Sequence, residues 1–226
     1  YNVAVGYNAG ANITTGTDNT AVGGVALQLN TTASNNTAIG RSALAANTTG
    51  STNVAVGSLC LDANTTGSNN VAIGVHALGG NTTADNNTAV GHNALKENTT
   101  GTSNVVIGAL ASDVSTTASE NTAVGYASLT TCTTGGANTA IGYVAMQNLT
   151  TGTNNTAVGN QAMTSITTGT QNVAMGREAL DANTTASNNV AVGFDALGLN
   201  TTGSVNTGVG NEAMESNTTG ANNTAI

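Results

Sequence analysis

The residues of this chain that could take part in chemistry are few and scattered. It has two histidines, two cysteines and eleven carboxylates among 226 residues. A metal site or an acid–base pair needs several such groups converging on one point. His76 and His92, with Asp85 and Glu97 nearby, form the densest grouping, but the two acids fall at different places in the repeat described below. We therefore expect two solvated histidines and no metal site.

Motifs for catalysis and for common ligands are missing. No acid pair, Ser/His/Asp set or phosphate-binding loop recurs at a shared place, and the glycines are too regular for a dinucleotide-binding turn. Three basic residues and a net charge of -8 give no footprint for nucleic acid. No apolar run is long enough to insert into a membrane. The sequence predicts a protein that is not an enzyme and needs no cofactor.

The dominant feature is a repeat of 17 residues that begins at an Asn, from Asn2 and Asn19 onward. We number its positions one to seventeen from that Asn. Such a drift-free short period is typical of a solenoid, in which each turn stacks on the last. Position five is Gly in every complete repeat: Gly6, Gly23, Gly40, Gly57, Gly74, Gly91, Gly108, Gly125, Gly142, Gly159, Gly176, Gly193 and Gly210.

Charged residues show which positions face solvent. Every Asp, Glu, Lys and Arg falls at position six, seven, ten, eleven, sixteen or seventeen. Charged side chains are almost never buried without a partner. Positions one to five, eight, nine and twelve to fifteen are therefore expected to be packed or held in ladders of identical residues.

The repeat predicts two strands and two turns. Positions one to five, as in 19–23, alternate β-branched residues and should form a strand. The Gly at position five predicts a tight turn with positive φ or no room for a Cβ, and position fifteen, which accepts Ala, should be freer. A second strand is expected over about positions eight to fourteen. We predict an all-β fold, a flattened parallel β-roll forming one continuous domain over 1–226.

Stacking predicts ladders of identical side chains. The position-one Asn residues should lie ~4.8 Å apart and bond to one another, and Thr at positions thirteen and fourteen should form two columns on opposite faces. Cys60 and Cys132 are four rungs apart, which is too far for a disulfide, so both are expected to be small packed residues.

The strand is apolar on both faces, with Val or Ile at position four and Ala at position three. One face can fill the coil against Leu at position nine. The other face needs a neighbour, and a second copy of the chain is the expected one.

Eight Asn residues at position twelve are formal glycosylation sequons. The alternative interpretation is turn chemistry with Thr ladders, which accounts for the same residues. The eight are Asn30, Asn47, Asn64, Asn81, Asn98, Asn183, Asn200 and Asn217.

Position six varies more than the strand columns and carries nearly all the aromatic residues. Exposed aromatic and Arg side chains commonly anchor binding surfaces. We therefore consider this column a candidate recognition edge for a host-surface glycan or protein, although an outward loop that tolerates any residue has the same pattern. Its main members are Tyr7, Arg41, His92, Tyr126, Tyr143, Arg177 and Phe194.

The units Asn19-Thr-Ala-Val-Gly23 with Ala26-Leu27, and Asn36-Thr-Ala-Ile-Gly40 with Ala43-Leu44, resemble the head repeats of trimeric autotransporter adhesins. They resemble still more the NTAVGxxAL arrays of bacteriophage tail fibres, and the resemblance covers the whole chain. It implies a left-handed parallel β-roll, three chains side by side, and an extracellular place on a cell surface or a virion. The unit is longer than the usual adhesin repeat by the Asn-Thr-Thr segment.

Three functions follow as expectations. The first is the shaft or head segment of a trimeric fibre involved in surface adhesion. The second is a self-assembling extracellular filament. The third is an ice-binding solenoid, suggested by the Thr columns, although adjacent Thr residues should face opposite ways. Because the chain starts and stops inside a repeat, we expect it to be a fragment of a longer fibrous protein.

Overall fold

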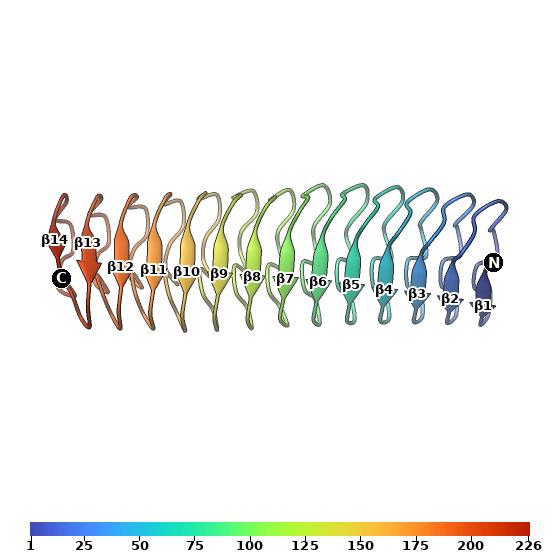
Figure 1. The fold of residues 1–226 in the computed structure, drawn as a ribbon, viewed down its shortest axis with the longest axis horizontal. Coiled ribbons are helices and arrows are strands. Elements are labelled where there is room, and N and C mark those ends of the chain that lie inside the picture. Colours follow the sequence, from blue (N-terminus) through green and yellow to red (C-terminus); the bar gives the residue numbers. More distant parts are fainter. The chain divides into compact units, whose positions relative to one another are not determined.

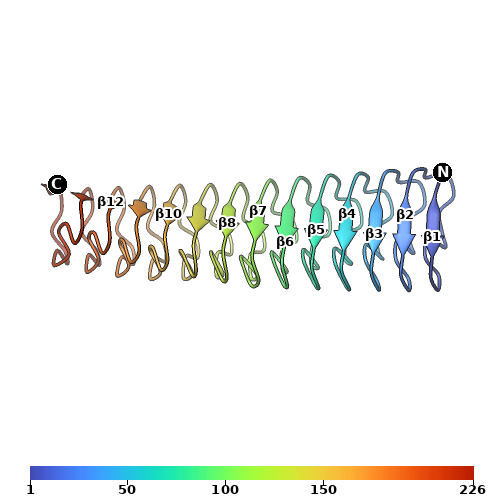
Figure 2. The ribbon, with the colours of Figure 1, turned by 60° about the horizontal axis from the view of Figure 1, so that its bottom comes forward.

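The computed structural model describes residues 1–226 as an all-β parallel β-solenoid of about thirteen turns with a 17-residue period and no helix. The chain divides into two compact units, Tyr1–Thr117 and Ala118–Ile226. We call them the first and the second unit. Each is a stack of equivalent rungs, and each rung contributes one short strand (Figures 1 and 2).

The strands occupy positions two to four of each repeat. In the first unit they are β1 (Val3–Val5), β2 (Thr20–Val22), β3 (Thr37–Ile39), β4 (Val54–Val56), β5 (Val71–Ile73), β6 (Thr88–Val90) and β7 (Val105–Ile107). In the second unit they are β8 (Thr122–Val124), β9 (Thr139–Ile141), β10 (Thr156–Val158), β11 (Val173–Met175), β12 (Val190–Val192), β13 (Thr207–Val209) and β14 (Thr224–Ala225).

Within each unit every strand pairs in parallel with the next, in a register of one repeat. Ala21 faces Ala38 across β2 and β3, and Ala140 faces Ala157 across β9 and β10. The repeat length therefore sets the register directly, and identical positions stack on one another.

The interior is filled by small and medium apolar side chains. The strand Ala at position three, the Ala at position eight and the Leu or Met at position nine are fully buried, as in Ala21, Ala26 and Leu27. The Ala side of the strand thus lines the coil, and the Val or Ile at position four points outward. This settles which of the two apolar strand faces fills the interior.

The expected second strand is wrong. Positions six to eleven form turns, because the backbone is left-handed at positions seven and nine, as in Val25 (φ 56°) and Leu27 (φ 51°). A strand needs negative φ throughout. The rungs still bond to one another there, since the Leu27 N–H donates to the Ala43 carbonyl at 3.0 Å and the Leu29 N–H to Ala45 at 3.0 Å.

The glycine turn at position five is confirmed. Gly57 has φ +142°, and a Cβ on it would lie 2.5 Å from the Gly74 carbonyl oxygen of the next rung. Position fifteen is tighter than expected, because a Cβ on Gly67 would lie 2.3 Å from the Ala84 oxygen. Position fifteen lacks positive φ and accepts Ala in some repeats, whereas position five combines the same crowding with positive φ.

The predicted ladder of position-one Asn residues is confirmed, and its members from Asn19 to Asn206 are buried. The Asn36 N–H and side-chain amide both donate to Oδ1 of Asn19, at 3.0 and 3.3 Å, and the same amide donates to the Gly50 carbonyl at 3.0 Å. Each Asn therefore joins its own rung to the rung before it and ties the strand to the turn at position fifteen.

A second buried Asn ladder runs at position twelve. The Asn47 side-chain amide donates to Oδ1 of Asn30 at 2.9 Å and to the Gly50 carbonyl at 2.9 Å. Hence the carbonyl at position fifteen accepts from both ladders. Two polar columns inside a narrow coil hold the two sides of each rung together.

Candidate interaction surfaces

The outward side of the strands carries Val, Ile or Met at position four and Thr or Val at position two. We call the side chains at positions two and four the outer strand face. Ile39 and Ile73 are each 40% exposed and Met175 is 46% exposed, which is high for large apolar side chains in strands. No charged residue occurs at these positions in any repeat. A row of exposed large apolar side chains without charges is a candidate interaction site.

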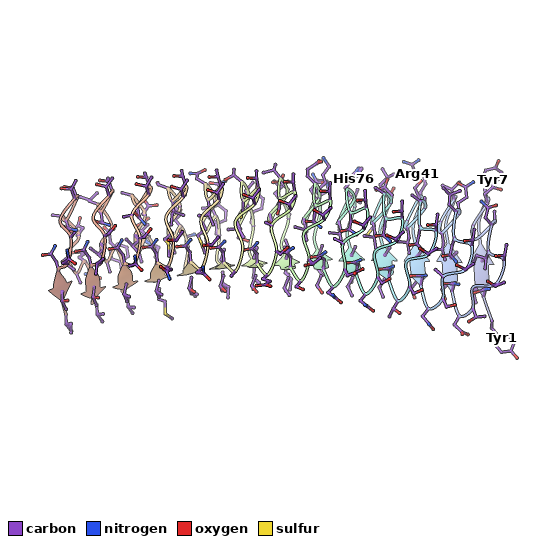
Figure 3. The ribbon with its side chains drawn as sticks, turned by 90° about the horizontal axis from the view of Figure 1, so that it is seen from above. Tyr1, Tyr7, Arg41 and His76 are labelled. Atoms are coloured by element: carbon purple, nitrogen blue, oxygen red, sulfur yellow. The ribbon has the colours of Figure 1, made fainter.

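The column at position six is exposed, as the sequence predicts, and we call it the position-six edge. Figure 3 shows Tyr7 and Arg41 along the side of the first unit away from the strand arrows. Tyr7 is 78% exposed, and Arg41 and His92 are also exposed. In the second unit Tyr126, Tyr143, Arg177 and Phe194 are exposed as well.

Four members of this edge form two ring contacts in the second unit. Tyr126 and Tyr143, on successive rungs, stack with ring centroids 5.6 Å apart and planes 13° from parallel. The Arg177 guanidinium lies 4.7 Å from the centre of the Phe194 ring. Stacked rings and cation–π contacts each contribute about 0.5–1.5 kcal/mol, which favours the paired arrangement while the rings remain exposed. The edge therefore presents paired aromatic side chains.

Carboxylates lie beside this edge at positions seven and ten. Burial raises the pKa of Asp62, Asp113 and Asp181 above the ordinary value of 3.8, and Glu178 raises that of Asp181 further. The pKa of Asp195 is also raised, by burial and then by Glu178 and Glu212.

Burial is the main cause of the raised pKa values at position ten, and backbone N–H groups that donate to Asp62 and Asp113 partly oppose it. Threonines in the same column make a different contact. There the Thr130 hydroxyl donates to the Ala127 carbonyl at 2.7 Å, and the Thr164 hydroxyl donates to Gln161 at 2.8 Å. Position ten is thus a half-buried place beside backbone carbonyl oxygens. It suits a donor, and an ionised carboxylate is an acceptor only.

The histidines do not meet. His92 is exposed and His76 is half-buried, and no group of three His, Cys, Asp or Glu residues is arranged to hold a metal ion. Both cysteines are free and buried, in agreement with the sequence prediction. Burial raises the pKa of the Cys60 thiol to about 12 and that of Cys132 to about 11. Both stay protonated at neutral pH.

The Cys132 thiol donates to the Gly135 carbonyl at 3.2 Å, which repeats the contact that Asn makes at position twelve. The sequon Asn residues occupy that same ladder. Seven of the eight are fully buried with their amide groups engaged inside the coil, and Asn217 is half-buried. The turn and ladder interpretation of these residues is therefore the one that the structure supports.

The two Thr columns differ in exposure. At position thirteen the Thr48 hydroxyl donates to the Thr65 carbonyl of the next rung at 2.9 Å and is half-buried. At position fourteen Thr49 is exposed, so this column does not belong to the packed set that the charges predicted.

Two features were missed by sequence reasoning. One is the ladder at position twelve. The other is at position sixteen, where a side-chain oxygen accepts the backbone N–H of the preceding rung, as Ser34 does for Thr17 at 3.0 Å. Asp85 accepts from Ser68 in the same way, at 2.6 Å. The preference for Ser and Thr in that column was the available signal.

No family model matches the sequence, and no curated protein matches it. The structure has no helix that could cross a membrane. It has no pocket.

Proposed function

We propose that this chain is a structural shaft or head segment of an extracellular or virion fibre involved in surface adhesion, in which three copies pack side by side. The observation that carries the proposal is the outer strand face, which in each unit is uncharged and carries exposed Ile or Met side chains at position four. The left-handed roll and the number of copies are those implied by the resemblance to fibre and adhesin repeats.

The distribution of charge supports packing against another copy. The chain carries a net charge of -8, so two copies repel each other wherever their acidic edges approach. No rung places a charge on the outer strand face. Packing there removes apolar side chains from water and keeps the acidic positions apart.

The position-six edge supports the adhesive part of the proposal. Its stacked Tyr126 and Tyr143 and its Arg177–Phe194 pair lie away from the strand layer and stay free when the outer strand face is covered. Ordered exposed aromatic side chains beside carboxylates suit a host-surface glycan or protein. Replacing both tyrosines with Ser should leave the fold intact and weaken binding to such a ligand.

Two alternatives are distinguished by simple measurements. An end-to-end filament would form long particles visible by electron microscopy. An ice-binding surface would have to rest on the position-fourteen Thr column, because Asn at position twelve is buried and Thr at position thirteen is half-buried and bonded to a carbonyl. A thermal-hysteresis assay tests that alternative.

A pair of charge substitutions tests the proposal. Val90→Asp places a carboxylate on the outer strand face, and Thr100→Asp places one at the exposed position fourteen of the same rung. Both variants should keep the β-type circular dichroism spectrum. The first should sediment as a single chain and the second as the parent assembly. Equal sedimentation of the two variants would show that copies do not meet at the outer strand face.

A further inference from the structure

Position four, at the centre of the outer strand face, alternates strictly between a small and a large side chain over eleven successive rungs. In the first unit the residues are Val22, Ile39, Val56, Ile73, Val90 and Ile107, and in the second unit Val124, Ile141, Val158, Met175 and Val192. The large members are the exposed ones, at 38–46% of their surface, and the Val residues between them are less exposed.

The alternation is confined to this column. Position two, on the same face, reads Thr20, Thr37, Val54, Val71 and Thr88 and has no two-rung period. Duplication of a two-repeat unit would have produced alternation in other columns as well. Thr and Val have nearly the same shape, so position two does not compensate for the change of size at position four.

Size alternation matters only where a surface is packed. On a solvent-exposed face Val and Ile are nearly equivalent. In a close-packed interface the additional methylene of Ile changes the packing energy. A period of two rungs also has to match the axial spacing of whatever lies against it. A second copy of this chain has the same ~4.8 Å rung and the same two-rung period. A partner with a different axial spacing would lose register with this face over many rungs.

The number of copies fixes the register. Two copies shifted by one rung would place each Ile against a Val. Three copies in mutual contact cannot do this, because when two of the contacts are shifted by one rung the third is level again. All three contacts have the same pairing of large and small side chains only when the copies are level or are shifted by a whole two-rung step.

We propose that three copies pack in register through the outer strand face, so that layers of three Ile or Met side chains alternate with layers of three Val. Each large layer then extends into the space that the Val layers leave above and below it, as alternation of large and small residues does in packed cores. This inference rests on the proposed function and adds the register and the composition of the shared core.

One substitution at two sites tests the layer pattern. Val158 lies between Ile141 and Met175, in the small phase of the alternation. Val5, in the rung before Val22, lies in the large phase, where the pattern expects a large residue. Val158→Ile places three large layers in succession and should weaken association roughly tenfold or more through overpacking. Val5→Ile extends the pattern and should leave association unchanged or stronger. Association is measured by sedimentation over a dilution series.

Cross-linking tests the register. Variants with one added cysteine, Ile141→Cys and Val158→Cys, are assembled separately and together, and then treated with a short thiol cross-linker. In register, each variant should link to itself more efficiently than to the other. A one-rung shift would favour the mixed product. Cys60 and Cys132 are buried and serve as the unreactive background.

The outcomes separate the two proposals. If the parent chain sediments as one copy, the proposed function fails and the register fails with it. If three copies form but Val158→Ile and Val5→Ile behave alike, or if mixed cross-links dominate, the alternating in-register core is overturned and the fibre proposal stands. Circular dichroism confirms that each variant retains the fold.

Discussion

The Asn138 side chain both donates and accepts hydrogen bonds, and it thereby links Asn121 on the preceding rung to Asn155 on the following rung. Its N–H and its amide donate to Oδ1 of Asn121 at 2.9 and 3.1 Å, while its own Oδ1 accepts the N–H of Asn155 at 3.0 Å. A buried side chain that satisfies groups on the rungs before and after it makes each rung depend on its neighbours.

Asn138→Ala should therefore be strongly destabilising. It leaves the buried Asn155 N–H and the Gly152 carbonyl without this partner, at a cost of about 1–3 kcal/mol for each buried group. The exposed Asn148→Ala is the matched control and should change the free energy of unfolding by less than about 0.5 kcal/mol. Urea unfolding of the two variants checks the difference, and equal midpoints would contradict the ladder's role.

The two glycine columns should differ in their response to Ala. Gly91 combines φ +138° with a Cβ position 2.6 Å from the Gly108 oxygen, whereas Gly67 is only crowded. Position fifteen accepts Ala elsewhere, as at Ala84. Gly91→Ala should cost ~1–3 kcal/mol more than Gly67→Ala. Thermal melting of both variants tests this, and a larger loss for Gly67→Ala would reverse the assignment.

Position seventeen offers a stabilising substitution. Every residue there has a left-handed backbone, and Val205 (φ 60°) is a β-branched residue that is 51% exposed. Asn tolerates this conformation better than Val and occupies it at Asn188. Val205→Asn should raise the free energy of unfolding by about 1 kcal/mol. Asn188→Val should lower it by a similar amount, and an unchanged melting temperature in both variants would refute the strain argument.

Mild acid should stabilise the fold. The pKa values of Asp62, Asp113, Asp181 and Asp195 are all raised in the folded chain, so the folded state binds these protons more tightly than the unfolded state. The free energy of unfolding should then rise as the pH falls from 7 through the folded pKa values toward the ordinary value of 3.8. Asp18, whose pKa is lowered, acts in the opposite sense.

Asp181→Thr isolates one contribution. Thr at position ten donates to a carbonyl, as Thr164 does, so the variant should be more stable than the parent at pH 7 and should depend less on pH. Thr164→Asp should do the reverse. Urea midpoints at pH 7 and 4.5 supply the comparison. An unaltered pH dependence in both variants would show that the position-ten carboxyls are solvated.

The sequence predicted the features that depend on stacking alone. The period, the parallel register, the position-one ladder and the Gly57-type turn follow from identical residues repeating every 17 positions. The prediction of a second strand is wrong. The apolar Leu at position nine suggested a strand, but the backbone of this buried residue is left-handed (Leu27, φ 51°). The hydrophobic pattern predicts which residues are buried, but it does not predict their backbone φ.

The candidate surfaces were also predicted only in part. That Tyr126 and Tyr143 are exposed followed from their shared column, but the 5.6 Å stack depends on side-chain orientation. Whether Val or Ala lined the interior was open, because both are apolar. The coil is too narrow for Val or Ile beside Leu at position nine in most rungs, and Ala takes that place.

The central claim is that copies of this chain pack side by side through the outer strand face. Native mass spectrometry of the unmodified chain at micromolar concentration tests it most directly. The account predicts a particle of three chains, each of 21.9 kDa. A mass equal to a single chain, with the β-type spectrum intact, would contradict it.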